Sequence, residues 1–300
     1  MSNAEHWEAS NADYHASPGV SNSRASIYND DPALFEAYFV SKRWEKPPPT
    51  KDQQRGTDLH LVVLPPGQLS DLMIEIPEDA LNAAGHRKGK AWLEFQAEHK
   101  GKILLKPEEI IPFSEVIDNI ALHPMADRYI NGDGYSEYNI RWTDEETGLN
   151  LRARLDRLCL DSEGAPEVIA ELKSAKSIHP KNFSYDLIKW GYHRQGAFYR
   201  EAVYQLTGMR IPFVFIAARK SPPYSVDCFE LDEAFLNAGE DELRTILRRI
   251  AKSYETGDWT KPGHGTVRLL SMPRSAQYDS EWEYVDDDGD EDEDRGAGYE

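Results

Sequence analysis

Apolar residues recur along most of the chain at spacings that predict an alternation of helices and strands. Asp31-Pro32, an N-cap followed by a proline suited to the first helical turn, precedes Leu34, Phe35, Tyr38 and Phe39 at helical spacing. The same period predicts further helices over residues 52–64, 114–130, 182–206 and 231–254. Residues 67–111 follow no clear period, and we assign no element there.

Strand character is found in five short segments, residues 135–142, 149–160, 167–173, 211–218 and 224–229. Turn sequences at residues 144–148 and 161–166 separate the first three segments, which predicts an antiparallel meander. The predicted order is therefore helices, a meander, a helix, further strands and a final helix. This order indicates a single α/β or α+β domain.

The placement of charge changes what the composition implies. The 300 residues are 40% apolar and 29% charged, as in a soluble globular fold. Taken over the whole chain, the net charge of −19 argues against a nucleic-acid partner. Residues 279–300 contain twelve acidic residues and one basic residue, so this segment carries −11 and the other residues carry −8. We expect disorder over residues 1–25, a folded domain over 26–262, and a linker with a disordered acidic tail over 263–300. The tail is either a solubilising segment or a docking peptide anchored by Trp282 and Tyr284.

Several classes of protein do not fit the sequence. No apolar run approaches the roughly 20 residues that span a bilayer, and the first residues lack the features of a secretory signal, so we expect a cytoplasmic protein without a membrane partner. Cys159 and Cys228 are too few for a four-cysteine zinc site or iron–sulfur cluster, and buried thiols are the simplest interpretation. A phosphate-binding P-loop and a nucleophile elbow are both absent from the sequence.

The hairpin formed by residues 149–160 and 167–173 carries the most informative geometry. Its turn is centred between residues 163 and 164, and Asp156 and Glu171 are equidistant from that centre. Facing residues of an antiparallel pair have Cβ atoms roughly 5 Å apart, so two bare carboxylates there repel unless a cation lies between them. Mg²⁺ prefers oxygen ligands and retains waters, which suits such a pair. Lys173 points to the same face as Glu171 and could orient water or offset charge on a phosphate.

A charge cluster on a solvated face is the competing interpretation of the same three residues. An aspartate followed at this distance by Glu-x-Lys is common by chance. Apolar neighbours, Leu155, Leu158, Val168, Ile169 and Leu172, favour a half-buried hairpin, where unpaired carboxylates are disfavoured.

Several motifs in one order resemble the PD-(D/E)xK nucleases, and more narrowly the RecE-type (exonuclease VIII-like) branch of phages and prophages. The motifs are Arg55-Gly56-Thr57-Asp58-Leu59-His60, Glu137 to Gly148, Arg154-Leu155-Asp156-Arg157, Glu171-Leu172-Lys173-Ser174 and Trp190 to Tyr199. The last contains the family's Gly-Tyr-x-x-Gln-x-x-x-Tyr pattern as Gly191, Tyr192, Gln195 and Tyr199. This chain has Leu155 where the family commonly has proline, and Glu171 and Ser174 where it commonly has aspartate and threonine.

The resemblance implies a fold and a set of site residues. It implies a single restriction-endonuclease-like domain, with a central mixed sheet flanked by helices. Asp156, Glu171, the Leu172 carbonyl and His60 would hold Mg²⁺, or Mn²⁺, with Lys173 positioning the attacking water. Glu137 would complete the acidic cluster or lie on a surface strand. Gln195, Tyr199, Tyr192 and Arg157 would contact DNA or support the site, and the same residues are also explained by packing.

The resemblance further implies an activity. It implies an ATP-independent exodeoxyribonuclease that digests linear double-stranded DNA from its 5′ ends and leaves 3′ single strands for recombination. Its partners would be DNA ends, a single-strand annealing protein and copies of itself in a ring, inside a bacterial or phage-infected cell. A RecB-like or Cas4-like nuclease of other polarity is one alternative. An inactive nuclease fold whose acidic tail mimics DNA is another.

Overall fold

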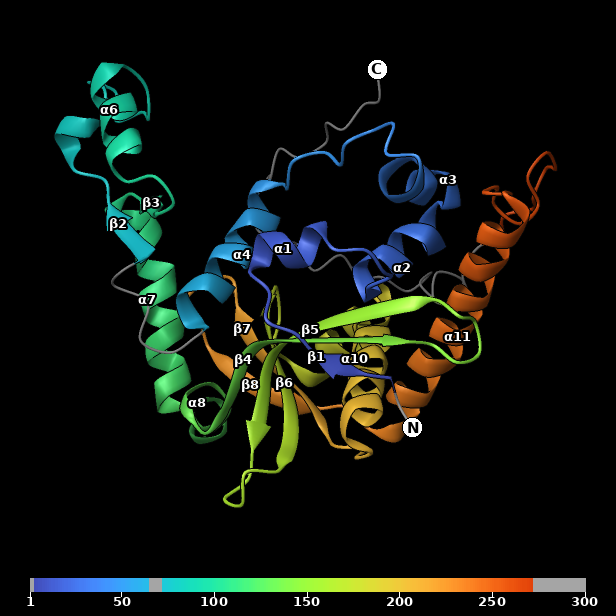
Figure 1. Ribbon diagram of the computed structural model, residues 1–300. Coiled ribbons are helices and arrows are strands. Elements are labelled where there is room, and N and C mark those ends of the chain that lie inside the picture. Colours follow the sequence, from blue (N-terminus) through green and yellow to red (C-terminus); the bar gives the residue numbers. More distant parts are fainter. Residues whose placement is uncertain (1–2, 65–71, 272–300) are drawn as a thin grey trace. The chain divides into compact units, whose positions relative to one another are not determined.

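The protein is represented by a computed structural model that describes residues 3–64 and 72–271 (Figure 1). The chain divides into a compact unit over Met1–Thr260 and a short second unit that begins at Lys261. None of the helices within the described ranges combines the length and the apolar character needed to cross a bilayer.

A six-stranded sheet forms the centre of the compact unit, in the order β1-β4-β5-β6-β7-β8. The strands are β1 (Glu5–His6), β4 (Gly134–Thr143), β5 (Asn150–Leu160), β6 (Pro166–Ala175), β7 (Phe213–Arg219) and β8 (Val226–Glu230). β6 and β7 run parallel while the other neighbours run antiparallel, so the sheet is mixed. A separate parallel pair is formed by β2 (Met73–Glu75) and β3 (Ile103–Leu105). The predicted α/β architecture with a mixed sheet and an antiparallel β4-β5-β6 meander is confirmed.

Helices cover both faces of the sheet, as the alternation along β7 requires. Phe213, Phe215 and Ala217 belong to the core beneath α10 and α11, whereas Val214 and Ile216 belong to the core beneath α4 and α7. A strand buried on both faces is expected to be apolar, and β7 is apolar and buried up to Ala218, before the exposed Arg219 at its end. The helices are α1 (Asn11–Ala16), α2 (Asn22–Asp30), α3 (Pro32–Phe35) with a π-helical turn (Glu36–Val40), α4 (Lys51–Val63), a 3-10 turn (Glu78–Ala80), α6 (Lys90–Glu98), α7 (Pro107–Leu122), α8 (Pro124–Asn131), α9 (Pro180–Lys189), α10 (Tyr192–Thr207) and α11 (Glu233–Thr256).

Two predicted helices are each divided into two. The helix expected over residues 114–130 is α7 followed by α8, because Pro124 cannot donate the backbone hydrogen bond that would continue α7. The helix expected over residues 182–206 is α9 followed by α10, because Gly191 adopts a left-handed conformation with φ of 67°. Gly208 ends α10 in the same conformation.

The N-terminal segment is ordered from residue 3, in contrast to the expected disorder of residues 1–25. β1 pairs with β4, and the side chains of Tyr14, Val20 and Ala25 are buried. Polar composition suggested disorder, but these few apolar side chains suffice to attach the segment to the sheet. Ser10 is the N-cap of α1, and its side chain accepts a hydrogen bond from the Asp13 backbone N–H. The acidic tail with Trp282 and Tyr284 lies outside the described residues.

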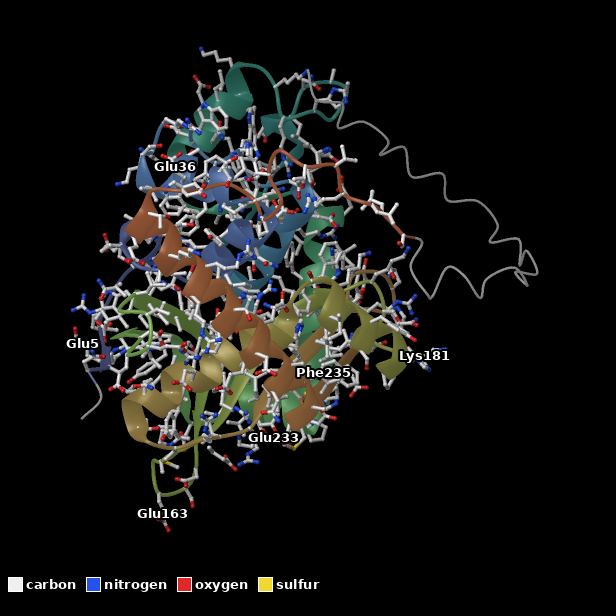
Figure 2. All side chains as sticks on the ribbon, turned by 90° about the vertical axis from the view of Figure 1, so that its right-hand side faces the viewer. Glu5, Glu36, Glu163, Lys181, Glu233 and Phe235 are labelled. Carbon is white, nitrogen blue, oxygen red and sulfur yellow. The ribbon has the colours of Figure 1, made fainter. Side chains whose placement is uncertain are left out.

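Figure 2 shows the molecule from the α11 side, with Glu233 and Phe235 at the N-terminal end of that helix. The turn between β5 and β6, with Glu163 at its tip, projects away from the body in the same view. The catalytic residues expected from the sequence lie toward the other end of these two strands. The tip of the hairpin is therefore free, and the expected catalytic residues lie toward its opposite end, which we call its base.

Candidate active site

The register of the β5–β6 hairpin brings the two predicted carboxylates together. Arg157 pairs with Ala170 and Leu158 with Ile169, which is the register predicted from the turn. Continuing this register by one residue places Asp156 beside Glu171. There the Leu172 N–H donates a hydrogen bond of 2.9 Å to Asp156 Oδ2, so the aspartate is held by the opposite strand.

Glu171 is almost completely buried, with 2% of its surface exposed, and has two side-chain donors. Lys173 Nζ donates to Glu171 Oε1 at 2.8 Å, and Gln195 Nε2 donates to the same oxygen at 2.6 Å. The other carboxylate oxygen, Oε2, is buried and has no hydrogen-bond partner in the part of the chain that the structure describes. A buried acceptor without a donor is costly, so this oxygen is available for a cation.

His60 connects helix α4 to both strands of the hairpin. Its Nε2 lies 2.9 Å from the Leu172 carbonyl oxygen, and its Nδ1 lies 3.3 Å from Asp156 Oδ1. A carbonyl oxygen can only accept, so Nε2 is the donor in the first contact. The structure therefore brings His60 to Asp156 and Leu172. Its expected role as a ligand of the metal ion stays a prediction.

The charges of the cluster separate the acidities of its two carboxyl groups. Burial raises the pKa of Glu171, and the neighbouring Asp156 charge raises it further. Burial also acts to raise the pKa of Asp156, but the charges of His60 and Lys173 more than offset this, and the pKa is lowered. Asp156 is thus the more acidic of the two carboxyl groups.

The two basic groups respond to the same carboxylates. Burial lowers the pKa of Lys173, yet the charges of Glu171 and Asp156 outweigh burial and leave the pKa above its usual value. The pKa of His60 is raised in the same way, since Asp156 opposes the effect of burial. In this arrangement Lys173 is an ammonium that donates to Glu171, and it is suited to holding a water or a phosphate oxygen.

Helix α10 supplies the three aromatic and amide residues named from the sequence. Lys173 Nζ lies 5.3 Å from the centroid of the Tyr192 ring, close enough for a cation–π contact. Tyr199 packs against Phe213 and has a hydrogen bond with Gln195, and burial raises its pKa well above the usual value. Gln195 therefore connects Tyr199 to Glu171.

Arg157 and Glu137 are placed differently from one another. The guanidinium of Arg157 is buried and donates to Tyr129 O, Ser136 Oγ and Gly132 O, which fits a supporting position under the loop before β4. Glu137 lines the catalytic cleft, but its carboxylate forms an ion pair with Arg154. The functional roles of both residues stay predictions.

A cleft of about 510 Å³ lies over this cluster, and its walls include residues that the sequence did not single out. Asn11, Tyr14 and His15 of α1 form part of the wall, and Arg154 lies beside Asp156 on β5. Burial raises the pKa of Tyr14 to about 12, so its hydroxyl stays protonated. In Figure 1, α1 and α4 lie next to each other above the strands that carry the carboxylates.

The donor set fits a hard divalent cation. Asp156, Glu171 and the Leu172 carbonyl provide oxygen ligands at one place, and Glu171 Oε2 lacks any other partner. Within residues 3–64 and 72–271 there is no group of three or more His, Cys, Asp and Glu side chains arranged to hold a metal. Two carboxylates with a carbonyl meet the needs of Mg²⁺, because this ion keeps several of its waters.

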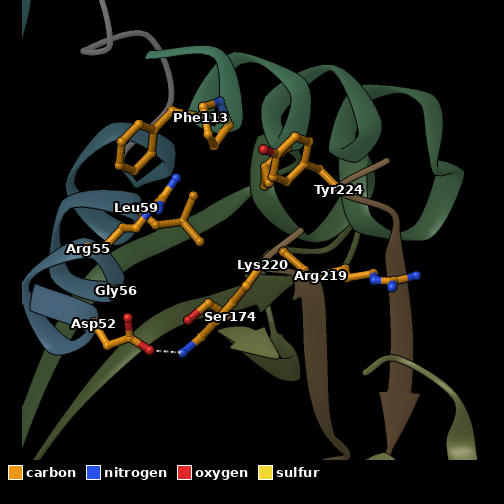
Figure 3. Close-up of a pocket in the computed structure, with 12 residues that line it drawn as sticks. Asp52, Arg55, Gly56, Leu59, Phe113, Ser174, Arg219, Lys220 and Tyr224 are labelled. Carbon is orange, nitrogen blue, oxygen red and sulfur yellow. Dashed lines mark hydrogen bonds and ion pairs between the residues drawn. The ribbon is translucent and has the colours of Figure 1, made fainter. Parts of the chain in front are cut away.

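A smaller cavity of about 120 Å³ lies behind α4, between this helix, α7 and the ends of β6 and β7 (Figure 3). Leu59, Phe113 and Tyr224 form apolar walls, and Lys220 forms an ion pair of 2.8 Å with Asp52 at the edge. Ser174, the residue after Lys173, also lines the cavity.

Two arginines of α10 form ion pairs with α11. Arg194 pairs with Glu242, and Arg200 pairs with Glu233. Both guanidinium groups are buried, so they stabilise the α10–α11 packing instead of facing DNA.

The fold and the family agree with this site. The sequence model of the PDDEXK-like domain of unknown function matches residues 78–266, most of the described chain. A candidate exonuclease from Eubacterium rectale has a similar structure, with a TM-score of 0.57 and 16% identity over 91% of this chain and 99% of that chain. An alkaline exonuclease from Laribacter hongkongensis is 16% identical over 60% of this chain and 88% of that chain, with a TM-score of 0.27. No curated protein matches the sequence. The chain belongs to the family of PDDEXK-like domains and has the PD-(D/E)xK nuclease fold.

Proposed function

We propose that the protein is a metal-dependent exodeoxyribonuclease that hydrolyses linear double-stranded DNA without ATP. The observation that supports this most directly is the buried pair of Asp156 and Glu171 with Lys173 at the base of the hairpin. Glu171 Oε2 has no partner in this cluster, which is the environment that a divalent cation completes. Membership of the PDDEXK-like family agrees with hydrolysis of a phosphodiester.

In this proposal, each residue of the site has a separate role. Asp156, Glu171 and the Leu172 carbonyl would hold Mg²⁺ or Mn²⁺, and the cation would supply charge that activates water and offsets charge on the phosphate. Lys173 would orient the attacking water through its ammonium group. His60 positions Asp156 and Leu172, and Gln195 positions Glu171 and Tyr199.

The finer parts of the proposal rest on the motif resemblance. Digestion from the 5′ end would leave 3′ single strands, which a single-strand annealing protein would use in phage-type recombination. A ring of copies around the DNA would keep the enzyme on its substrate. The candidate exonuclease from Eubacterium rectale has a similar fold over nearly its whole length, which is compatible with an exonuclease.

Labelled linear duplex DNA tests the proposal. The purified full chain is incubated with duplex labelled at the 5′ or the 3′ end, with Mg²⁺ or with EDTA. Asp156→Ala and Lys173→Ala are compared with Asp241→Ala and Lys252→Ala, matched substitutions at exposed positions on α11.

We expect Mg²⁺-dependent loss of label from 5′ ends that both site variants abolish and both control variants retain. Loss from 3′ ends alone would overturn the polarity and keep the nuclease. Binding of DNA without cleavage by the unaltered chain would overturn the enzymatic proposal. Cleavage that survives both site substitutions would show that the catalytic centre lies elsewhere.

A further inference from the structure

A second groove lies beside the catalytic cleft, between the N-terminal segment and β4. Its volume is about 880 Å³, and it is lined by residues that include His6, Tyr135, Tyr138 and Arg154. Asn11, Glu137 and Arg154 line both the groove and the catalytic cleft. The two cavities therefore share part of their walls, and Arg154 belongs to this shared part, which we call the junction.

Three aromatic rings form a stack along this groove. The rings of His6 and Tyr138 are 4.0 Å apart at the centroids and inclined by 6°, and those of Tyr138 and Tyr135 are 5.0 Å apart and inclined by 29°. Tyr135 is 50% exposed, so the stack ends on a ring that is open to solvent. Stacking on aromatic side chains is the way in which proteins hold unpaired bases, and any base can use it.

An unusual backbone conformation accompanies the stack. On a regular strand, residues three apart point to opposite faces, so Tyr135 and Tyr138 would not stack. Glu137 lies between the two tyrosines and has a φ of 50°. This left-handed conformation is uncommon for glutamate, and such residues gather at functional sites. It interrupts the alternation of β4 at the place where Tyr135 and Tyr138 stack and where Glu137 meets Arg154.

Arg154 has a side-chain donor that finds no acceptor among the described residues. One nitrogen of its guanidinium, Nη2, binds Glu137, while Nη1 is buried and has no partner. Guanidinium groups bind phosphate oxygens through more than one nitrogen, so this nitrogen is suited to a phosphate that enters the junction.

We propose that the groove binds an unpaired segment of the DNA strand that enters or leaves the catalytic cleft. One base stacks on Tyr135, and Arg154 Nη1 donates to the phosphate at the junction, with Glu137 as the residue that positions Arg154. Glu8 lies at the rim beside His6, so the aromatic side of the groove repels phosphates and favours bases. This inference rests on the proposed nuclease function and adds the path of the strand.

Binding without cleavage tests the stacking contact. A short single-stranded oligodeoxynucleotide carrying 2-aminopurine at successive positions is titrated with the full chain in EDTA, so that affinity and stacking are measured in the absence of hydrolysis. The variants are Tyr135→Ala, Tyr135→Phe and the control Tyr204→Ala, a partly exposed tyrosine on α10. We expect Tyr135→Ala to weaken binding by about 5- to 150-fold, the range for loss of one base–aromatic stack.

In the same titration, we expect fluorescence quenching at one position in the oligonucleotide to be lost with Tyr135→Ala. Tyr135→Phe keeps the ring and should retain both affinity and quenching, as should Tyr204→Ala. Equal binding by Tyr135→Ala and the unaltered chain would overturn the stacking contact.

Kinetics with duplex DNA test the junction. Arg154→Lys keeps the positive charge but removes the planar pair of guanidinium donors. Glu137→Gln keeps the shape of the side chain but removes the ion pair with Arg154. Each substitution should therefore raise KM for DNA more than it lowers kcat. The Mg²⁺ concentration that gives half of the maximal rate should not change in either variant. A shift in that concentration with Glu137→Gln would instead make Glu137 a metal ligand and overturn its positioning role.

The two proposals fail in different ways. If the unaltered chain cleaves duplex DNA but Tyr135→Ala and Arg154→Lys bind and cleave as it does, the groove is not the path of the strand and the nuclease remains. If the unaltered chain binds the oligonucleotide through Tyr135 but never cleaves, the groove stands and the enzymatic proposal fails.

Discussion

Gln195→Leu is a sharp test of how α10 controls the catalytic pair. Gln195 Nε2 donates to Glu171 Oε1 at 2.6 Å and lies almost fully buried on the first turn of the helix. Leucine has a similar size, so the substitution removes the donor and leaves little empty space. Glu171 then keeps only the hydrogen bond from Lys173.

The size of the effect follows from the charge of the acceptor. A hydrogen bond to a charged group contributes about 1.5–3 kcal/mol, roughly twice the value for a neutral pair. If the full free energy of this hydrogen bond lowers the activation barrier by holding Glu171 in position, its loss should reduce kcat by about 10- to 150-fold. The hydrogen bond between Gln195 and Tyr199 is lost at the same time, so we expect the upper part of this range.

The assay compares steady-state cleavage of linear duplex by Gln195→Leu and by Gln205→Leu. Gln205 lies on the same helix, and its amide donates to Glu201 at 2.8 Å near the opposite end. We expect Gln205→Leu to leave kcat within about twofold, since surface substitutions rarely exceed about 0.5 kcal/mol. Unchanged kcat in folded Gln195→Leu would refute a positioning role. An equal fall in both variants would attribute the loss to the helix and not to Glu171.

Three further predictions concern stability and reactivity. Burial acts to raise the pKa of Asp144, but hydrogen bonds from Thr147 and Arg244 outweigh it and the pKa is lowered. Its contribution is therefore complete above the unfolded pKa and lost as pH falls through the lower folded value, so the free energy of unfolding should fall in acid less steeply in Asp144→Asn. Gly239→Ala would place a Cβ 2.4 Å from the His193 carbonyl oxygen, so the free energy of unfolding measured in urea should fall by about 1–3 kcal/mol or more. Gly208 has open space around it but a φ of 74°, so Gly208→Ala should lower the same free energy by only about 1–2 kcal/mol. Burial raises the pKa of Cys159 to about 11, so iodoacetamide at pH 8 should label this thiol slowly in the folded protein and rapidly in urea, and rapid labelling of the folded chain would contradict its burial.

The sequence alone predicted those parts of the protein that depend on local order. The turn between β5 and β6 sets the hairpin register, because the side-chain period of a strand is two and the turn centre determines which residues face each other. Asp156 and Glu171 could therefore be placed together without any knowledge of the rest of the chain. The apolar segment over residues 211–218 was likewise predicted as a strand, and it forms β7.

Local pattern was insufficient where one residue overrides a period. The apolar spacing of α7 continues into α8, but Pro124 divides the two, and Gly191 divides α9 from α10. The N-terminal segment was expected to be disordered because its composition is polar. A few buried side chains, among them Tyr14, are enough to order it once the sheet provides a surface.

Only the tertiary structure decided how distant segments complete the site. His60 meets Leu172 across 112 residues, and α10 brings Gln195 to Glu171 across 24. Tyr14 and Arg154 enter the cleft through the pairing of β1 with β4 and of β4 with β5. Such contacts depend on which faces pack together, and packing is a property of the whole core that no local period encodes. The sequence by itself determined the two carboxylates and their register. The packed structure determined which donors reach these carboxylates, and it left Arg154 Nη1 without an acceptor among the described residues.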